Sequence, residues 1–379
     1  MSRRCVDVRL QEFLLGRLLF KRIPSDRLAL RIPSLLLNGY LDSSRCRRAV
    51  VDNQFAVAVA KDYFVQEVML NVMYAPQNEY CYIIDSKASM KFHAMMRNLS
   101  RCFPNVHISD IEYVVDSAGN NMTRSLLQCL CVLLKRPHWK YVFLLQNHDF
   151  LLKTNAELVK ILSVFNGSND VEMKELTYGA LRGVRWKFST LNLFRDDRSN
   201  DNRHLRFAKG GVQSVFSRES VDYIINKLNL TLSLSKLDKL GYGNDELLLP
   251  TLNMQDEIGV PGGFTRRCIG NESFHTTKFA VWAHMSGCSS NAYRHNVCIF
   301  GIEDLQMLMN QDRLIANKML PEFDYSAFSC WMQILFNLTH GMMQRRLNLD
   351  LYARLPHVRF NRQRERWSSN ITAFDCTYH

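Results

Sequence analysis

The sequence predicts a mixed α/β fold in which helices cover both faces of a mostly parallel sheet. Strand-like and helical segments alternate four times between residues 54 and 165, and short connections join them. This alternation is typical of a parallel sheet, whose successive strands are joined by helices that pack on its faces. The chain has 379 residues, and its hydrophobic content of 47% is ordinary for a globular protein. Disorder, collagen and coiled coil are therefore excluded as descriptions of the whole chain.

The four strand–helix pairs follow in order along the first half of the chain. β-branched and apolar residues predict strands at 54–60, 79–85, 105–109 and 140–145. Apolar residues at helical spacing predict helices at 61–74, 90–99, 122–136 and 155–165. Ligands of such sheets sit beyond the carboxyl ends of the strands. We therefore expect a binding site near the polar residues that follow two of these strands, Asp85–Lys87 and Asn147–Asp149.

Beyond residue 165 the alternation weakens. Strands are predicted at 210–216, 279–284 and 296–301, helices at 217–228 and 301–310, and a turn at 261–264. Asn244 is expected to cap a helix over residues 245–254, which Pro250 limits or kinks. Residues 1–50 and 345–379 are poorly patterned, so we expect them to be peripheral.

Positive charge gathers at the two ends of the chain. Lys and Arg number 48 against 36 Asp and Glu, and residues 1–50 and 341–366 hold the whole surplus. A nucleic-acid-binding protein usually spreads basic residues along one face of its fold, so no nucleic-acid partner is predicted. The basic ends are either solvated or contact an acidic membrane surface or another polyanion.

No apolar stretch reaches the roughly 18 residues of a membrane-spanning helix, because Arg17, Lys21 and Arg31 interrupt the best candidates. No signal peptide is evident either. The chain is therefore expected to be soluble, with a basic N-terminal segment over 1–50 that holds no recognisable membrane anchor.

The cysteines and sequons favour an oxidising, glycosylating compartment. The eleven cysteines do not have the paired spacing of a zinc site. Seven Asn-x-Ser/Thr sequons supply glycosylation candidates at Asn98, Asn121, Asn166, Asn229, Asn271, Asn337 and Asn370.

The common catalytic motifs are absent from the strand–helix junctions. No GxGxxG, GxxxxGK[ST], HExxH or GxSxG occurs there, which excludes the most frequent dinucleotide, nucleotidase, protease and hydrolase classes. A nucleotide-type sheet with acidic and basic residues at its loop ends would suit an enzyme that handles a sugar nucleotide.

Seven segments, in order between about residues 54 and 330, resemble the core-2/I-branching N-acetylglucosaminyltransferase family. They include YAPQNEYCYIIDSKAS (74–89) and GNDELLLPTLNMQDEIGVPGGF (243–264); the others are 101–106, 138–159, 217–225, 279–282 and 297–318. The resemblance implies a GT-A-like fold with a C-terminal acceptor-side subdomain, and a catalytic domain over 51–340 that a basic tail over 341–379 follows. It also implies a Golgi enzyme that transfers a sugar with inversion, GlcNAc being the preferred one, from a UDP-sugar to a hydroxyl of an O-glycan or glycoprotein.

The resemblance also implies roles for individual residues. Glu246 matches the family's general base, although Asp245 and Glu246 alone would more often be an acid pair at a helix start. The leaving diphosphate would bind Lys318 and Arg294, with His295 as the alternative to Arg294 because the loop is one residue longer than the family pattern. The candidates for binding the donor are Asp85 and Lys87. The candidates for binding the acceptor are Trp282 and Asp245.

The family is metal-independent, so we predict neither metal nor other cofactor, although Asn147–Asp149 mimics an Asp-x-Asp motif. Asp149 is expected to hold its loop. Cys288–Cys298 and Cys46–Cys129 match family disulfides. The usual partner position of Cys102 is occupied by Gln146, and the partner of Cys330 is absent.

Two other functions stay open. Gln146, His284 and the altered arginine loop depart from the family pattern, which would also suit a catalytically inactive glycan-binding relative. The basic ends would suit a polyanion-binding protein.

Overall fold

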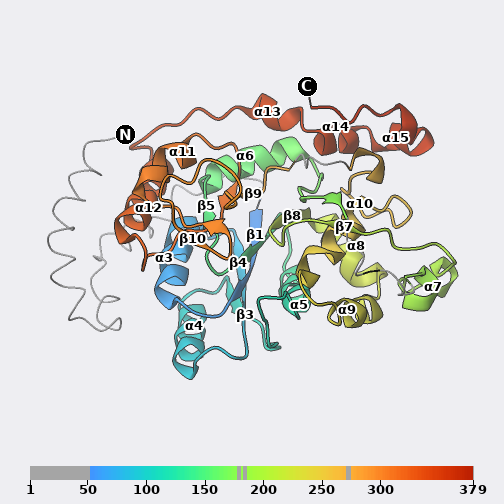
Figure 1. Cartoon of the computed structure of the whole chain (residues 1–379), viewed down its shortest axis with the longest axis horizontal. Helices are drawn as coiled ribbons and strands as arrows, with labels where there is room; N and C mark the ends of the chain where they lie inside the picture. The colour runs from blue at the N-terminus through green and yellow to red at the C-terminus, as the bar shows by residue number, and fades with distance from the viewer. Residues whose placement is uncertain (1–51, 177–180, 182–185, 270–274, 379) are drawn as a thin grey trace.

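The computed structural model describes residues 52–176, 181, 186–269 and 275–378. Within these residues a central sheet has the strand order β3–β2–β1–β4–β8 (Figure 1). Strands β1 to β4 are parallel, whereas β8 is antiparallel to β4. The predicted mixed α/β fold with a mostly parallel sheet is therefore confirmed. The bounds are β1 (Asp52–Val59), β2 (Glu79–Ile84), β3 (Val106–Ile108), β4 (Trp139–Gln146) and β8 (Ser214–Ser217).

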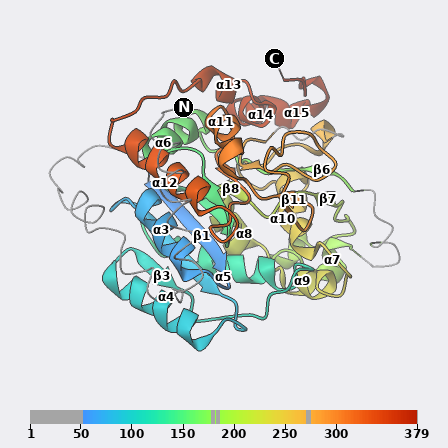
Figure 2. The same cartoon turned by 60° about the vertical axis from the view of Figure 1, so that its left-hand side comes forward.

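Helices cover both faces of this sheet. In β1, Phe55 and Val57 join the apolar core on one face, and Ala56 and Ala58 join the core on the other, because successive side chains of a strand point to opposite faces. The Phe55 side holds α3 (Tyr63–Met73), α4 (Met90–Cys102), α6 (Asn155–Phe165) and α12 (Tyr325–Thr339). The Ala56 side holds α5 (Met122–Leu134), α8 (Arg218–Lys227), α9 (Thr231–Leu237) and α10 (Leu248–Met254). Both views show α3 and α12 side by side (Figures 1 and 2).

The predicted strand over 210–216 is only partly correct. The structure has β7 (Ala208–Lys209), which pairs with β6 (Lys174–Glu175), and then β8 from Ser214. Between them Gly210 lies directly against the backbone carbonyl of Glu172, so close that a Cβ would clash with it. Gly210 therefore marks a close approach of two backbones instead of a continuous strand.

The predicted role of Asn244 as a helix cap is wrong. Residues Asn244–Glu246 form a separate 3-10 turn, which follows Gly243 in the left-handed region, and α10 begins at Leu248. The Asn244 amide instead donates to Asn120 Oδ1 at 2.6 Å and to the Leu240 carbonyl at 3.2 Å. Asn244 therefore ties the Glu246 turn to the loop that precedes α5.

The strands predicted at 279–284 and 296–301 are much shorter in the structure. A small sheet has the order β5–β12–β9, and β10 forms a hairpin with β11. A 3-10 turn (Ile302–Asp304) precedes α11, where one helix was expected. The remaining bounds are β5 (Phe150–Leu151), α7 (Phe188–Leu191), β9 (Lys278–Phe279), β10 (Tyr293–Arg294), β11 (Val297–Cys298), α11 (Leu305–Met309) and β12 (Ile315–Ala316).

The C-terminal segment packs against the core, so the expectation that residues 345–379 are peripheral is wrong. It contains α13 (Leu349–Ala353), α14 (Pro356–Arg362) and α15 (Arg364–Ser369), which run along one edge of the molecule beside α6 (Figure 1). Tyr352 and Phe374 are buried. Cys376 forms a disulfide with Cys268, which the sequence analysis did not predict. The domain boundaries at residues 50 and 340 stay predictions.

The disulfide pattern confirms one predicted pair and corrects the other. Cys288–Cys298 is present. Cys129 pairs with Cys81 and not with Cys46, which lies outside the described residues. Cys81 lies on β2 and points to the face that α5 covers, where its Cα is 5.5 Å from that of Cys129.

Removing the Cys81–Cys129 bond is expected to destabilise the fold without changing its architecture. The bond closes a chain segment with a sequence separation of 48, and a disulfide of this kind stabilises a protein by about 2–4 kcal/mol. Cys81→Ala/Cys129→Ala should lower the free energy of unfolding by that amount, measured by urea denaturation. Cys102→Ala is the control, because exposed Cys102 forms no disulfide within the described residues. Equal stability of the double variant and the control would contradict this assignment.

Candidate active site

A cavity of about 190 Å³ lies at the carboxyl ends of the parallel strands. The ends of β1, β2 and β4 contribute Ala60, Asp85, Gln146 and Asn147 to its lining, and the start of α5 contributes Ser125. The cavity lies where the sheet topology predicts a ligand.

Asp85 and Lys87 form one side of this region. Asp85 Oδ1 accepts a hydrogen bond from the backbone N–H of Lys87 at 2.9 Å, and the Lys87 ammonium lies 3.7 Å from Asp85 Oδ2. Lys87 Nζ also donates to the Val115 carbonyl at 2.5 Å. Asp85 lines the cavity itself, whereas Lys87 secures the loop around it.

The Asn147–Asp149 segment is held by contacts within the protein. Asn147 Oδ1 accepts from the backbone N–H of Ala60 at 2.8 Å, and His148 Nε2 lies 2.6 Å from Asp62 Oδ2.

Asp149 is buried, and burial raises its pKa. Its carboxylate accepts from the Gln146 N–H at 2.6 Å, from Gln213 Nε2 at 3.1 Å and from Asn317 Nδ2 at 2.7 Å. These contacts are those of a residue that holds its loop, and they also anchor Asn317 beside Lys318.

Lys318 and Arg294 lie close enough to influence each other. Burial lowers the pKa of Lys318, and the Arg294 charge lowers it further. Arg294 is half-buried on β10, with Nη1 3.9 Å from Glu322 Oε1, whereas His295 is exposed. Of the two candidates in this loop, Arg294 is the one that is half-buried and whose charge contributes to the lowered pKa of Lys318.

Asp245 and Glu246 form an acid pair at the turn before α10. Glu246 Oε2 lies 2.9 Å from Lys209 Nζ, and the Glu246 carbonyl accepts from the Gly210 N–H at 2.9 Å. The pKa of Asp245 is raised to about 6, chiefly by burial and also by the Glu246 charge. Gly119 lies against Asp245 so closely that a side chain there would clash with it.

The charge of Lys278 acts on both Asp245 and Lys318. Its charge opposes the rise in the pKa of Asp245 and contributes to the lowered pKa of Lys318. The geometry follows from the small sheet: β9 carries Lys278 and pairs in parallel with β12, which Lys318 follows by two residues. Sequence reasoning missed both Lys278 and Lys209. The only signal for Lys278 was its place next to the matched FAVW segment.

Trp282 lies at the edge of the same region. It is half-buried and forms an isolated bridge with Val297 in β11, the partner strand of the hairpin that carries Arg294. His284, two residues further, is exposed. The structure thus places Trp282 beside the Arg294 hairpin.

Metal-ligand clusters do not appear in the described residues. No three His, Cys, Asp or Glu side chains of residues 52–176, 181, 186–269 or 275–378 gather in a way that could hold a metal ion.

Comparison with known protein families identifies the family of this chain. The model of the family described as "Branch: Core-2/I-Branching enzyme" matches residues 54–309. The chain belongs to this family. The resemblance inferred from the seven segments is confirmed, and with it the assignment to the glycosyltransferases.

The relatives of this family member that are described next are all named as β-1,6-N-acetylglucosaminyltransferases. It is 28% identical over 317 residues to a zebrafish (Danio rerio) "Beta-1,3-galactosyl-O-glycosyl-glycoprotein beta-1,6-N-acetylglucosaminyltransferase 4", covering 77% of this chain and 73% of that protein. The mouse protein of the same name is 30% identical, with 73% and 64% covered. A human "N-acetyllactosaminide beta-1,6-N-acetylglucosaminyl-transferase" is 29% identical, with 70% and 67% covered. The matches thus span about two thirds of the length of these relatives.

A solved structure, that of residues 1–349 of S. aureus TarS, aligns with 84% of the chain and 75% of that protein at 13% identity. Its TM-score of 0.31 supports no conclusion about this family member.

The predicted glycosylation sites of this family member differ in their surroundings. Asn98, Asn166 and Asn370 are exposed, whereas Asn121, Asn229 and Asn337 are half-buried. Asn271 lies outside the described residues. Within the part of the chain that the structure describes, no helix has the length and apolar character to cross a bilayer.

Proposed function

We propose that the chain is an inverting, metal-independent glycosyltransferase that moves GlcNAc from UDP-GlcNAc to a hydroxyl of an O-glycan or glycoprotein. Family membership supports the reaction class, and the names of the relatives support GlcNAc as the sugar. The acceptor we propose is the β-1,3-galactosyl O-glycan that the first relative's name describes.

The observation that carries this proposal is that the charge of Lys278 acts on one member of the acid pair and on one member of the cation pair. Its ammonium influences both Asp245 of the acid pair and Lys318 of the cation pair. Inversion requires a base on one side of the anomeric carbon and the leaving group on the other. An acid pair and a cation pair that both lie within electrostatic reach of one lysine supply the two kinds of group that this reaction needs.

Each candidate residue then has a chemical role. Glu246 would take the proton of the acceptor hydroxyl as its oxygen bonds to the anomeric carbon. The bond from that carbon to the diphosphate would break at the same time, and Arg294 and Lys318 would neutralise the charge that develops on UDP. Asp85 and Lys87 would hold the nucleoside part of the donor.

The acceptor would bind at Asp245 and Trp282. Because the pKa of Asp245 is about 6, this carboxyl group is present in both protonation states near that pH, so it can donate or accept a hydrogen bond to a sugar hydroxyl. The face of Trp282 would pack against the C–H groups of the sugar.

A second function, binding of glycans without catalysis, is favoured by the Lys209–Glu246 ion pair. Lys209 Nζ lies 2.9 Å from Oε2 of Glu246 and so forms an ion pair with the carboxylate that would act as base. An active enzyme must let the acceptor hydroxyl share this carboxylate. Glycan-array binding without any release of UDP in the presence of acceptor would establish the inactive alternative.

Transfer is expected to proceed in EDTA at the same rate as in Mn²⁺. The physical reason is that Arg294 and Lys318 supply fixed positive charge where a divalent cation would otherwise neutralise the diphosphate. The measurement is transfer of radiolabelled GlcNAc from UDP-GlcNAc to a β-1,3-galactosyl O-glycan by secreted protein. An absolute requirement for Mn²⁺ would contradict the proposed mechanism, and the absence of transfer under both conditions would contradict the proposed function.

The proposed location is the Golgi lumen or its membrane. Three disulfides within the described residues, Cys81–Cys129, Cys268–Cys376 and Cys288–Cys298, fit an oxidising compartment. O-glycan acceptors and UDP-sugars would be the partners there.

A further inference from the structure

A second, larger cavity lies at the opposite edge of the central sheet. It is a groove of about 600 Å³ whose lining includes Lys140 and Tyr141 at the amino end of β4. The cavity of the candidate active site touches the other end of the same strand, at Gln146. Strand β4 rises about 3.3 Å per residue, so the two cavities lie roughly 15–20 Å apart.

Asn166, the asparagine of a sequon, forms part of this groove. It is exposed, and it ends α6 in the left-handed region at φ 47°. Its backbone N–H donates to the Leu162 carbonyl at 3.3 Å, and its backbone carbonyl accepts from Asn361 Nδ2 at 3.0 Å. Its side-chain amide donates no hydrogen bond to any described residue. In the sequon at Asn121, by contrast, the amide Nδ2 donates to the Val114 carbonyl at 2.9 Å.

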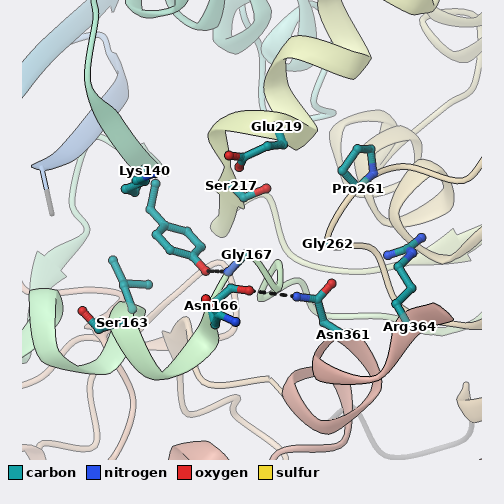
Figure 3. A pocket seen from close by; sticks show the side chains of 12 residues that line it. Lys140, Ser163, Asn166, Gly167, Ser217, Glu219, Pro261, Gly262, Asn361 and Arg364 are labelled. Carbon is teal, nitrogen blue, oxygen red and sulfur yellow. Dashed lines mark hydrogen bonds between the residues drawn. The ribbon is translucent and has the colours of Figure 1, made fainter. Parts of the chain in front are cut away.

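The groove has the mixed chemistry that a sugar needs. Figure 3 shows Asn166 and Gly167 in the middle of the lining residues, with Lys140 on one side and Asn361 and Arg364 on the other. The ring of half-buried Pro261 provides apolar surface for the C–H face of a pyranose. Tyr141 is buried, and its hydroxyl accepts a hydrogen bond from the Gly167 N–H at 2.6 Å. Exposed charged side chains stand nearby to hydrogen-bond hydroxyl and acetamido groups; they are Lys140 and Glu219.

We propose that Asn166 carries an N-linked glycan and that the first GlcNAc residues of this glycan lie in the groove. In the attachment step the Asn166 Nδ2 bonds to the anomeric carbon of the first GlcNAc of a lipid-diphosphate-linked oligosaccharide. The bond from that carbon to the diphosphate breaks, the lipid diphosphate leaves with the electron pair, and the amide loses one proton.

The attachment must precede folding of this turn. Ser168, the third residue of the sequon, is fully buried, and its hydroxyl donates to the His357 carbonyl at 3.1 Å. Once folded, the turn places Asn166 at the surface and the sugar over the groove. The proposal requires passage through a glycosylating compartment, but it does not depend on transfer activity.

Site mapping tests the modification. The full chain is secreted from mammalian cells and is deglycosylated enzymatically in H₂¹⁸O, so that each occupied Asn becomes an ¹⁸O-labelled Asp in the peptide mass spectrum. We expect label at Asn166. A secreted chain with no label at Asn166 overturns the proposal, whatever its transfer activity.

A double-variant cycle tests the position of the glycan. Asn166→Gln is expected to lower the Tm by roughly 2 °C, whereas Asn98→Gln, which removes an exposed sequon on α4 outside the groove, leaves it unchanged. Lys140→Ala is then made in the native chain and in the Asn166→Gln chain. A glycan in the groove makes the Lys140→Ala effect larger in the native chain, because the sugar attached to Asn166 would contact Lys140 and so couple the two sites. Equal Lys140→Ala effects in both chains would show that the glycan projects into solvent and would overturn its placement.

Discussion

Glu246→Gln is expected to lower the turnover number about 10³-fold while the protein keeps its fold and its affinity for UDP. A carboxylate that accepts the hydroxyl proton in the transition state contributes roughly 10²–10⁴-fold to the rate. The amide has nearly the same shape but cannot take that proton. It can also still accept a hydrogen bond from Lys209, which lies 2.9 Å from Oε2. The measurement is initial-rate transfer of GlcNAc with saturating donor and acceptor, together with UDP binding by calorimetry.

Glu219→Gln is the matched control for this variant. Glu219 is an exposed glutamate in the first turn of α8, and it lines the groove at the opposite edge of the sheet. Its substitution should change the rate less than twofold. Equal rates in the native chain and Glu246→Gln would show that the base is elsewhere, whereas equal losses in the two variants would point to a general effect on stability.

The first half of the fold was predictable because its elements have clean periodicity. Strands 54–60 and 140–145 are apolar runs that lie buried on both faces of the sheet, and the helices between them show an apolar stripe at helical spacing. Their bounds in the structure, Asp52–Val59 and Trp139–Gln146, differ from the prediction by at most two residues. Here local pattern and tertiary burial agree.

The second half was less predictable because long-range contacts, and not periodicity, determine its structure. The C-terminal residues have little pattern, yet α13 packs on α6, and Arg345 pairs with Glu157 on α6 at 2.5 Å. The Cys268–Cys376 bond fixes the same segment from the other side. Neither the ion pair nor the disulfide has a local sequence signal.

The candidate site also contains both residues that could be proposed from the sequence and residues that could not. Glu246, Lys318 and Arg294 lie in recognisable segments, so resemblance could propose them. Lys209 and Lys278 could not be predicted, because they are isolated lysines that the pairings β6–β7 and β9–β12 bring to the acid pair and the cations. The Cys46–Cys129 prediction failed for a related reason: it was carried over from the family pattern, whereas Cys81 faces α5 from the neighbouring strand.

Lys318→Met and Arg294→Met are each expected to lower the turnover number about 10²-fold. Removing one fixed donor that stabilises developing negative charge has an effect of this size, and Met keeps an apolar stem of similar length. His295→Ala is the matched control from the same hairpin, because His295 is exposed. A loss in His295→Ala that exceeded the loss in Arg294→Met would transfer the role in phosphate binding to His295.

The pH dependence separates an electrostatic role of Lys318 from a structural one. Burial and the Arg294 charge lower the pKa of Lys318, so its positive charge is lost at a lower pH than that of an ordinary lysine as the pH rises. The alkaline limb of kcat/KM, which reports the enzyme without bound substrate, should therefore lie below the range of an exposed lysine. Lys318→Arg keeps the charge at all working pH values, so it should move this limb to higher pH and retain more activity than Lys318→Met. An alkaline limb at the same pH in the native chain and in Lys318→Arg would show that the ionisation of Lys318 does not control the reaction.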